Sequence, residues 1–119
     1  MGKYLNTEKI AEELQRFATA RDWDQFHTPK NLATSISVES AELLELFQWT
    51  RGQKDWSEIE DEELREKIEN EVADILLYLI RFSDMAKIDL EKAAMKKIAI
   101  NEKKYPIEQS KGSDKKYNE

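Results

Sequence analysis

The sequence predicts an all-α protein with four main helices. Apolar residues recur at helical spacing through most of the chain, and no stretch shows the alternation of apolar and polar residues that is typical of a strand. Glycine and proline, which interrupt helices, occur only three times and twice in 119 residues. A chain of this length forms one domain with a modest hydrophobic core.

The first two helices are predicted from periodicity and from a strong start signal. Residues 6–20 carry an apolar stripe with the i, i+3, i+4, i+7 spacing of a helix face. Residues 21–28 are rich in aromatic side chains and lack this periodicity, so we expect a loop. Thr28 is a typical N-cap and Pro29 a typical first helical residue. We expect the second helix to continue to about Trp49.

The third and fourth helices are predicted on either side of a short break. Residues 51–60 are polar and contain a glycine, and Ser57–Glu60 has the sequence of a capping box. The third helix, about residues 61–85, is the longest and most apolar. Asp89 is the expected N-cap of the fourth helix, about residues 90–104, which ends before a proline. We therefore expect a helical domain over residues 1–108, followed by a polar tail over residues 109–119.

Composition excludes several classes of function. The net charge of −6 argues against general nucleic-acid binding. No run approaches the roughly 20 apolar residues that span a membrane, and residues 1–10 lack the order of a signal peptide. The absence of cysteine is typical of a cytoplasmic protein. We expect a cytoplasmic protein that binds neither nucleic acid nor membranes.

The charges are unevenly distributed along the chain. From Lys92 to Glu119, eight lysines stand against four acidic residues, so this last quarter carries +4 and the remainder −10. An acidic body that holds a metal, with a basic C-terminal quarter, suits a metal-bound polyphosphate as ligand. Solvated helix faces and a charged tail explain the same distribution equally well.

Two pairs of carboxylates are the most informative feature of the sequence. Glu39 and Glu42, and likewise Glu71 and Asp74, are three residues apart within apolar helical patterns. Residues at this spacing are neighbours on one helix face, and carboxylates among apolar neighbours are costly unless they are paired or bind a metal. At ~1.5 Å per residue, an antiparallel arrangement brings both pairs to nearly the same level. The sequence thus predicts one site for divalent cations.

The ligand types select the cation. Carboxylates alone favour Mg²⁺ or Mn²⁺ over zinc. A di-iron centre normally needs Glu-x-x-His twice, whereas this chain has one histidine, in a predicted loop. The competing interpretation is that the acidic residues simply face solvent. That interpretation suits residues 58–63 but not Asp74, which lies within an apolar run.

Other candidate residues lie near the predicted site by helical spacing. Tyr78 and Arg81 follow Asp74 on the third helix, and a row of Lys97, Asn101 and Lys104 on the fourth could donate to phosphate oxygens. An exposed basic stripe near a helix C-terminus explains that row as well, and pattern alone favours this explanation. Trp23, Phe26 and Trp49 lie near helix ends, where a ring could stack on a base or fill the core, and pattern alone favours the core. His27 by itself says little, because a loop histidine is more often structural or exposed than functional.

Taken together, these motifs resemble those of the MazG-like superfamily of all-α nucleoside triphosphate pyrophosphohydrolases. The superfamily's E-x-x-E and E-x-x-D motifs match residues 39–42 and 71–74. Within it the sequence is most similar to the dCTP pyrophosphatase group. Segments similar to that group are residues 21–27, 42–49, 101–106 and 116–119. Leu14 stands where vertebrate members carry a histidine, so a base or sugar contact made there is missing.

The resemblance implies an activity and a set of site residues. The implied reaction is Mg²⁺-dependent hydrolysis of dCTP or modified deoxycytidine triphosphates between the α- and β-phosphates, which yields the monophosphate and pyrophosphate. A carboxylate, Glu42 or Glu45, would orient or deprotonate the attacking water. The implied metal ligands are Glu39, Glu42, Glu71 and Asp74. The implied substrate contacts are Trp23, Phe26, His27 and Trp49 for the base, and Tyr78, Lys97 and Asn101 for the triphosphate.

The assembly and two alternative functions complete the expectations. The apolar run over residues 75–82 has more surface than three short neighbouring helices readily cover. The resemblance implies a homo-oligomer, a dimer or a dimer of dimers, whose joint bundle completes the active site. One alternative is a dUTP-specific or broad-specificity pyrophosphatase of the same superfamily. The other is a non-catalytic helical interaction module, against which the retention of all four carboxylates counts.

Overall fold

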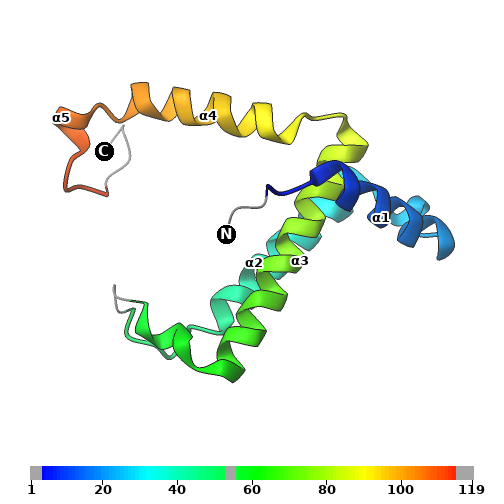
Figure 1. Ribbon diagram of the computed structural model, residues 1–119, viewed down its shortest axis with the longest axis horizontal. Coiled ribbons are helices and arrows are strands. Elements are labelled where there is room, and N and C mark those ends of the chain that lie inside the picture. Colours follow the sequence, from blue (N-terminus) through cyan, green and yellow to red (C-terminus); the bar gives the residue numbers. More distant parts are fainter. Residues whose placement is uncertain (1–3, 53–55, 115–119) are drawn as a thin grey trace. The chain divides into compact units, whose positions relative to one another are not determined.

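The computed structural model describes residues 4–52 and 56–114, and within these ranges the chain is helical with no strand (Figure 1). The predicted all-α class and the four main helices are confirmed. The segment 116–119, which resembles a family motif, lies outside the described residues. In chain order the elements are α1 (Thr7–Ala20), the 3₁₀-helix η1 (Asp24–Phe26), α2 (Pro29–Glu45), the 3₁₀-helix η2 (Ser57–Glu60), α3 (Glu62–Ala86), α4 (Leu90–Lys104) and α5 (Ile107–Ser110).

The helix starts follow the capping signals in the sequence. The side chain of Thr28 accepts a hydrogen bond from the Asn31 amide at 3.2 Å, so Pro29 opens α2 as predicted. Asp89 caps α4 in the same way, with the Lys92 amide 3.0 Å from its carboxylate. Each cap satisfies one of the amide groups that have no partner within the first turn of a helix.

One predicted boundary is wrong and another is close to the observed one. Helix α2 ends at Glu45 rather than Trp49, because the amides of Leu46 and Phe47 bond three residues back, which tightens the chain into turns. The start of α3, expected at about residue 61, lies at Glu62, and Ser57–Glu60 forms the separate 3₁₀-helix η2 before it. Asp61 is the N-cap of α3, and its carboxylate accepts from the Leu64 amide at 2.9 Å. Its short acidic side chain is as good a cap as serine.

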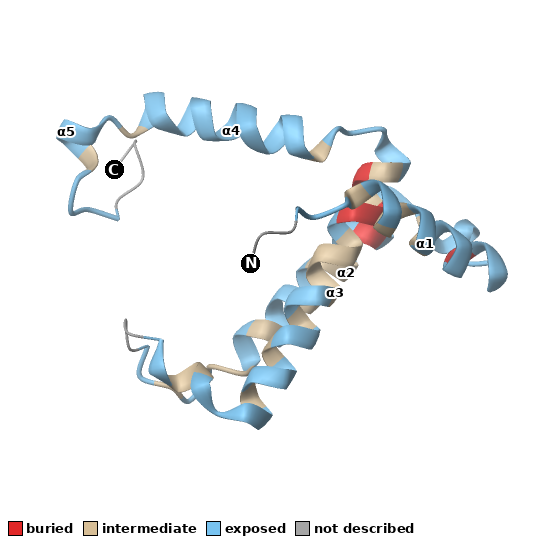
Figure 2. Ribbon diagram, in the orientation of Figure 1, coloured by how far each residue is buried: buried red, intermediate tan, exposed pale blue. Residues whose placement is uncertain are grey.

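The chain divides between Ala86 and Lys87 into two compact units. In the first unit α3 is central: it packs most extensively against α2 and also contacts α1 and η2 (Figure 1). Most of the buried residues in this unit lie where α2 meets the C-terminal part of α3, and one more lies on α1 (Figure 2). They are Ala18, Leu32, Ile80, Arg81 and Ser83.

The core of this unit is small, and much apolar surface remains exposed. No large side chain in the described residues is completely shielded from solvent. On α2 the side chain of Leu44 is 70 % exposed, and Val38, Val72 and Leu79 are also exposed along α2 and α3. In the second unit, α4 exposes Met95 and its neighbours on both sides of the helix.

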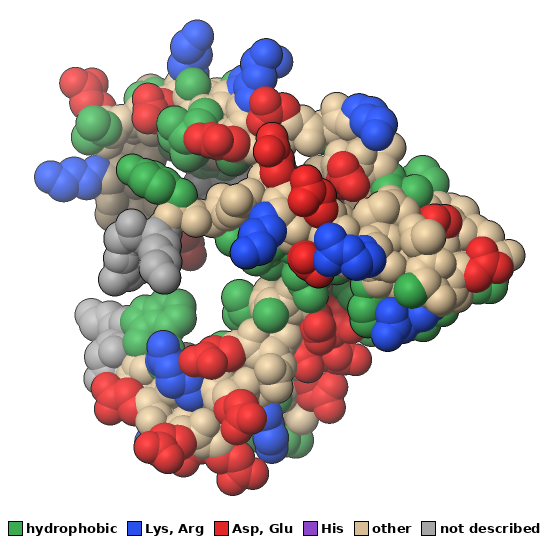
Figure 3. Space-filling view, turned by 45° about the vertical axis from the view of Figure 1, so that its right-hand side comes forward, with side chains coloured by type: hydrophobic (Ala, Val, Ile, Leu, Met, Phe, Trp, Pro, Cys, Tyr) green, Lys and Arg blue, Asp and Glu red, His purple; other side chains and the backbone are tan. Residues whose placement is uncertain are grey.

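One group of acidic residues lies at the surface of the first unit, apart from the carboxylate pairs of α2 and α3. Acidic side chains crowd the end that carries η2 and the start of α3 (Figure 3). Residues 60–63 are exposed there, so the solvent-facing interpretation fits this group. None of the helices in the described residues combines the length and apolarity that a bilayer crossing requires.

Candidate active site

Three of the four predicted metal ligands meet between α2 and α3. Glu39 and Glu42 come from one face of α2, and Glu71 comes from the facing side of α3. One carboxylate oxygen from each lies within 4.8 Å of the other two. Glu39 and Glu71 are half-buried, whereas Glu42 reaches the surface. The predicted arrangement of the two motifs at the same level of an antiparallel helix pair is therefore present in the fold.

The electrostatics of this cluster indicate a missing positive partner. Burial raises the pKa of Glu39 to about 7, and the hydrogen bonds with Glu42 and Glu71 and the nearby charges of Glu42 and Asp74 act in the same direction. One oxygen of Glu39 and one of Glu71 are buried without any hydrogen-bond partner in the described part of the chain. A buried acceptor without a partner costs about 1–3 kcal/mol, and more when it is charged. A divalent cation would remove both costs.

The donor atoms fit a hard cation. All of the clustered ligand atoms are carboxylate oxygens, which Mg²⁺ and Mn²⁺ prefer. Asp74 is not part of the group within 4.8 Å, but its charge acts on Glu39 and its side chain lines the adjoining pocket. Glu45, the second candidate for orienting water, is the exposed last residue of α2 and is not among the clustered ligands.

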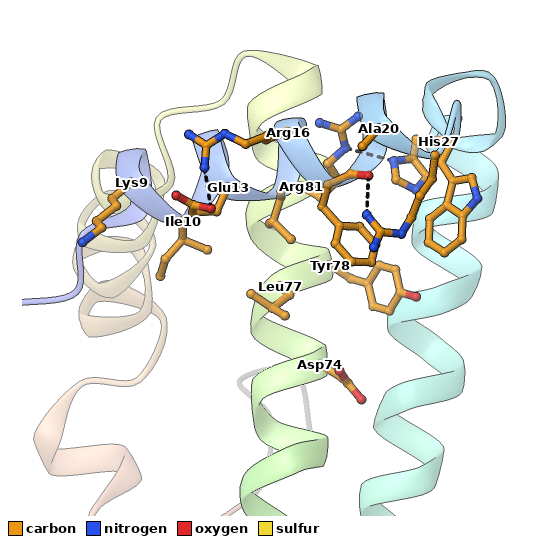
Figure 4. A pocket seen from close by; sticks show the side chains of 14 residues that line it. Lys9, Ile10, Glu13, Arg16, Ala20, His27, Asp74, Leu77, Tyr78 and Arg81 are labelled. Atoms are coloured by element: carbon orange, nitrogen blue, oxygen red, sulfur yellow. Dashed lines mark hydrogen bonds and ion pairs between the residues drawn. The ribbon is translucent and has the colours of Figure 1, made fainter.

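A pocket of about 860 Å³ opens beside Asp74 and extends along α3 to α1 and to residues 21–28, which we call the aromatic loop. This volume is within the range of small-molecule sites. Figure 4 shows His27, Arg81 and Tyr78 toward one end of the pocket and Asp74 farther along α3. The lining residues are Lys9, Ile10, Glu13, Leu14, Arg16, Phe17, Ala20, Arg21, Trp23, His27, Asp74, Leu77, Tyr78 and Arg81.

The aromatic end of this pocket is built by the turn that follows α1. The Trp23 amide donates to the Ala18 carbonyl at 2.9 Å, which turns the indole back toward the helix. The Trp23 ring meets the ring of Phe17 edge-to-face at a centroid distance of 5.5 Å and that of His27 at 6.5 Å. Apolar contact and edge-to-face stacking thus hold Trp23 in the pocket wall.

Sequence reasoning missed the role of Arg81. Its guanidinium is buried and donates to Gln15 on α1 and to Asp24 and His27 in the aromatic loop. Burial and the Arg81 charge lower the pKa of His27, against a smaller opposing effect of Asp24. An arginine inside the apolar run of α3 was the available signal, because such a residue requires partners.

Two of the predicted substrate contacts in the first unit do not line this pocket. Phe26 is 57 % exposed and Trp49 is 89 % exposed, and both lie outside its wall. Lys97 and Asn101 are exposed on α4, in the second unit. Of the predicted base and phosphate contacts, the pocket therefore gathers Trp23, His27 and Tyr78.

Comparison with known proteins gives concordant matches. The sequence profile of the MazG-like family matches residues 34–119. The chain is 37 % identical to human dCTP pyrophosphatase 1 over 97 % of its own length and 70 % of the relative's, and 34 % identical to the rat protein over 95 % and 69 %. The crystal structure of a pyrophosphatase from Archaeoglobus fulgidus superposes with a TM-score of 0.77 at 42 % identity, covering 89 % of this chain and 97 % of that one.

The raised pKa of Glu39 predicts how the stability of the metal-free protein depends on pH. Because the folded-state pKa is about 7 and the ordinary value is 4.5, the folded protein keeps a proton that the unfolded chain releases. The stability contribution is therefore complete below the ordinary value and is lost as pH rises through about 7. Thermal unfolding in EDTA should show this decline.

Glu39→Gln, which cannot ionise, should flatten this pH dependence, and Glu60→Gln on the exposed surface should leave it unchanged. Added Mg²⁺ should raise the melting temperature most at the alkaline end, where the cluster is fully charged. An unaltered decline in Glu39→Gln would show that the carboxylate cluster is not its source.

Proposed function

This chain belongs to the MazG-like family and is a nucleoside triphosphate pyrophosphatase, and we propose that it hydrolyses dCTP or modified deoxycytidine triphosphates with Mg²⁺ as cofactor. The observation that carries the proposal is the carboxylate cluster. Two of its oxygens are buried without a partner, and it lies beside a pocket that Asp74 lines. A metal-bound triphosphate would place its charge against the acidic end and its base among the aromatic rings.

In the proposed reaction, water attacks the α-phosphorus, and the bond between this phosphorus and the oxygen that bridges to the β-phosphate breaks. The bridging oxygen leaves with pyrophosphate, and the attacking oxygen remains on the monophosphate. Bound Mg²⁺ supplies charge neutralisation at the phosphates and lowers the pKa of coordinated water. Glu39, Glu42, Glu71 and Asp74 are the proposed ligands. Glu42, which belongs to the cluster and reaches solvent, is better placed than Glu45 to orient the attacking water. Tyr78, Lys97 and Asn101 are the proposed contacts of the triphosphate.

The base end of the pocket supports a single-ring base. Phe17, Trp23 and His27 form its aromatic wall, in which the rings of Phe17 and Trp23 meet edge-to-face. Phe26 and Trp49 are proposed to reach the base from a second copy of the chain. A dUTP-specific or broad-specificity pyrophosphatase is the alternative, and it differs only in how the base edge is read. A panel of dNTPs assayed for pyrophosphate release distinguishes the two.

We predict that Glu71→Gln and Asp74→Asn reduce the rate of pyrophosphate release by about 100-fold or more, because even residues that merely support metal ligands contribute 10–100-fold. Both changes keep the side-chain shape and remove one negative charge. Calorimetry should show weakened Mg²⁺ binding, and circular dichroism should show intact helices. Glu60→Gln is the matched control. Near-normal turnover in either variant would place the metal site elsewhere.

Base selection gives the second prediction. Trp49→Ala should raise KM for all nucleotides by a similar factor, because stacking, worth about 1–3 kcal/mol per base, does not distinguish bases. His27→Ala should instead narrow the difference in kcat/KM between dCTP and dUTP. Trp56→Ala, which alters another exposed indole, serves as control. Turnover of dATP or dGTP as efficient as that of dCTP would refute the pyrimidine assignment while leaving the pyrophosphatase activity intact.

The exposed apolar surface of α2 and α3 supports a homo-oligomer, a dimer or a dimer of dimers. The first unit leaves Val38, Leu44, Val72 and Leu79 exposed on its two main helices, which is unusual for a helix pair that folds alone. We predict that sedimentation at micromolar concentration shows a dimer or larger species. Leu44→Glu should dissociate it, whereas Glu45→Gln should not. A well-folded wild-type monomer would contradict this prediction.

A further inference from the structure

Arg81 connects three elements that line the pocket: α3, α1 and the aromatic loop. Its side chain, 3 % exposed, donates from Nη1 to Gln15 Oε1 at 2.7 Å, from Nη2 to Asp24 Oδ1 at 2.7 Å and from Nε to His27 Nδ1 at 3.0 Å. Gln15 Nε2 also donates to Asp24 at 3.1 Å, which closes a ring of hydrogen bonds. The ion pair between the buried Arg81 and the half-exposed Asp24, together with these hydrogen bonds, thereby fixes the aromatic loop to α1 and α3.

These contacts determine the tautomer of His27. A guanidinium has donors only and is always protonated, so the nitrogen that it contacts must offer a lone pair. His27 Nδ1 is therefore unprotonated, and the neutral ring carries its proton on Nε2. Burial and the Arg81 charge lower the pKa of the ring, which favours this neutral form. Because His27 lines the pocket, Nε2–H is the polar group that the ring has left for a ligand.

We propose that Arg81 is a positioning residue that fixes His27 as an Nε2–H donor, and that this donor selects cytosine by pairing with the N3 acceptor of the base. The proposal rests on the nucleotide pyrophosphatase function proposed above. Arg81 itself acts through His27 and through the loop that it anchors.

The chemistry of the bases gives this donor its selectivity. Cytosine presents an unprotonated N3, which accepts a hydrogen bond, whereas N3 of uracil and thymine carries a proton. A fixed Nε2–H would face a second donor in dUTP or dTTP and leave both without a partner. Sites built around one hydrogen bond reject ligands that cannot form it, because the buried group loses its partner. A histidine free to exchange tautomers would accept either base.

The wild-type tautomer is the first test. His27 is the only histidine in the chain, so a two-dimensional ¹H–¹⁵N spectrum of the imidazole reports on this ring without assignment work. In mildly alkaline buffer without nucleotide, we expect a single neutral form with the proton on Nε2. A ring protonated on Nδ1, or an even mixture of tautomers, would overturn the proposal whether or not the protein hydrolyses dCTP.

The second test removes the guanidinium that fixes His27 as a donor. Arg81→Met keeps the length and apolar stem of the side chain, and should give mixed tautomers together with a roughly tenfold smaller ratio of kcat/KM for dCTP over dUTP, about the value of one hydrogen bond. Arg65→Met, which removes an exposed arginine of α3 outside the pocket, should change neither quantity. An unchanged tautomer or an unchanged ratio in Arg81→Met would refute the proposal.

A third variant covers the case in which Arg81→Met does not fold. In His27→Gln the amide oxygen can accept from Arg81 Nε in place of Nδ1, which leaves the amide nitrogen as a donor near the position of Nε2, so this variant should keep the dCTP preference. His27→Leu, of similar size and without a donor, should lose it. Equal preferences in these two variants would overturn the proposal. The assay of the wild-type protein tests the proposed function separately. If no nucleotide released pyrophosphate, the proposed function would be refuted, whereas the tautomer of His27 would still be decided by the spectrum.

Discussion

The mutual repulsion of the carboxylates between α2 and α3 is the constraint on which the first unit depends. Two helices that pack along their length would ordinarily bury apolar side chains along the whole contact. Here Glu39 and Glu71 occupy the middle of that contact, and two of their oxygens have no partner in the described residues. The apolar core is accordingly small and lies toward the far end of α3, around Leu32 and Ile80. A carboxylate cluster that could hold a cation is thus present at the expense of stability.

At the other end of the pocket, a buried charge has its partners within the protein. Arg81 is as buried as the apolar core residues, yet each of its three donor nitrogens has a partner, one of which is the Asp24 carboxylate. An ion pair with one buried partner need not add stability. Its geometry does restrict the loop that carries Trp23 and His27, because the loop has no regular helix of more than three residues to hold it.

Local features of this protein were predictable from its sequence and nonlocal ones were not. Caps such as Thr28 and Asp89 act on amides three residues away, and the spacing within each carboxylate pair is a property of one helix. The ring around Arg81 joins residues 54 to 66 positions apart, which no periodicity records. The early end of α2 was missed because Leu46, Phe47 and Trp49 continue the apolar character of the helix while the hydrogen bonds of this segment change from helix to turn.

The two ends of the pocket therefore differ in what completes them. At the acidic end, one oxygen of Glu39 and one of Glu71 have no partner in the described residues. Under the proposed function, the binding of a metal-bound triphosphate would also relieve the repulsion between these carboxylates. The aromatic end already has its internal hydrogen bonds, since Arg81 donates to Nδ1 of His27 and to Asp24 and leaves Nε2–H of His27 for a ligand. A hydrogen-bond donor that is held in place before the base binds requires no rearrangement, and such preorganisation lowers the free-energy cost of binding. Under the two proposals, discrimination between bases and metal-dependent turnover would depend on separate sets of residues, joined by α3, which supplies both Arg81 and the proposed ligands Glu71 and Asp74.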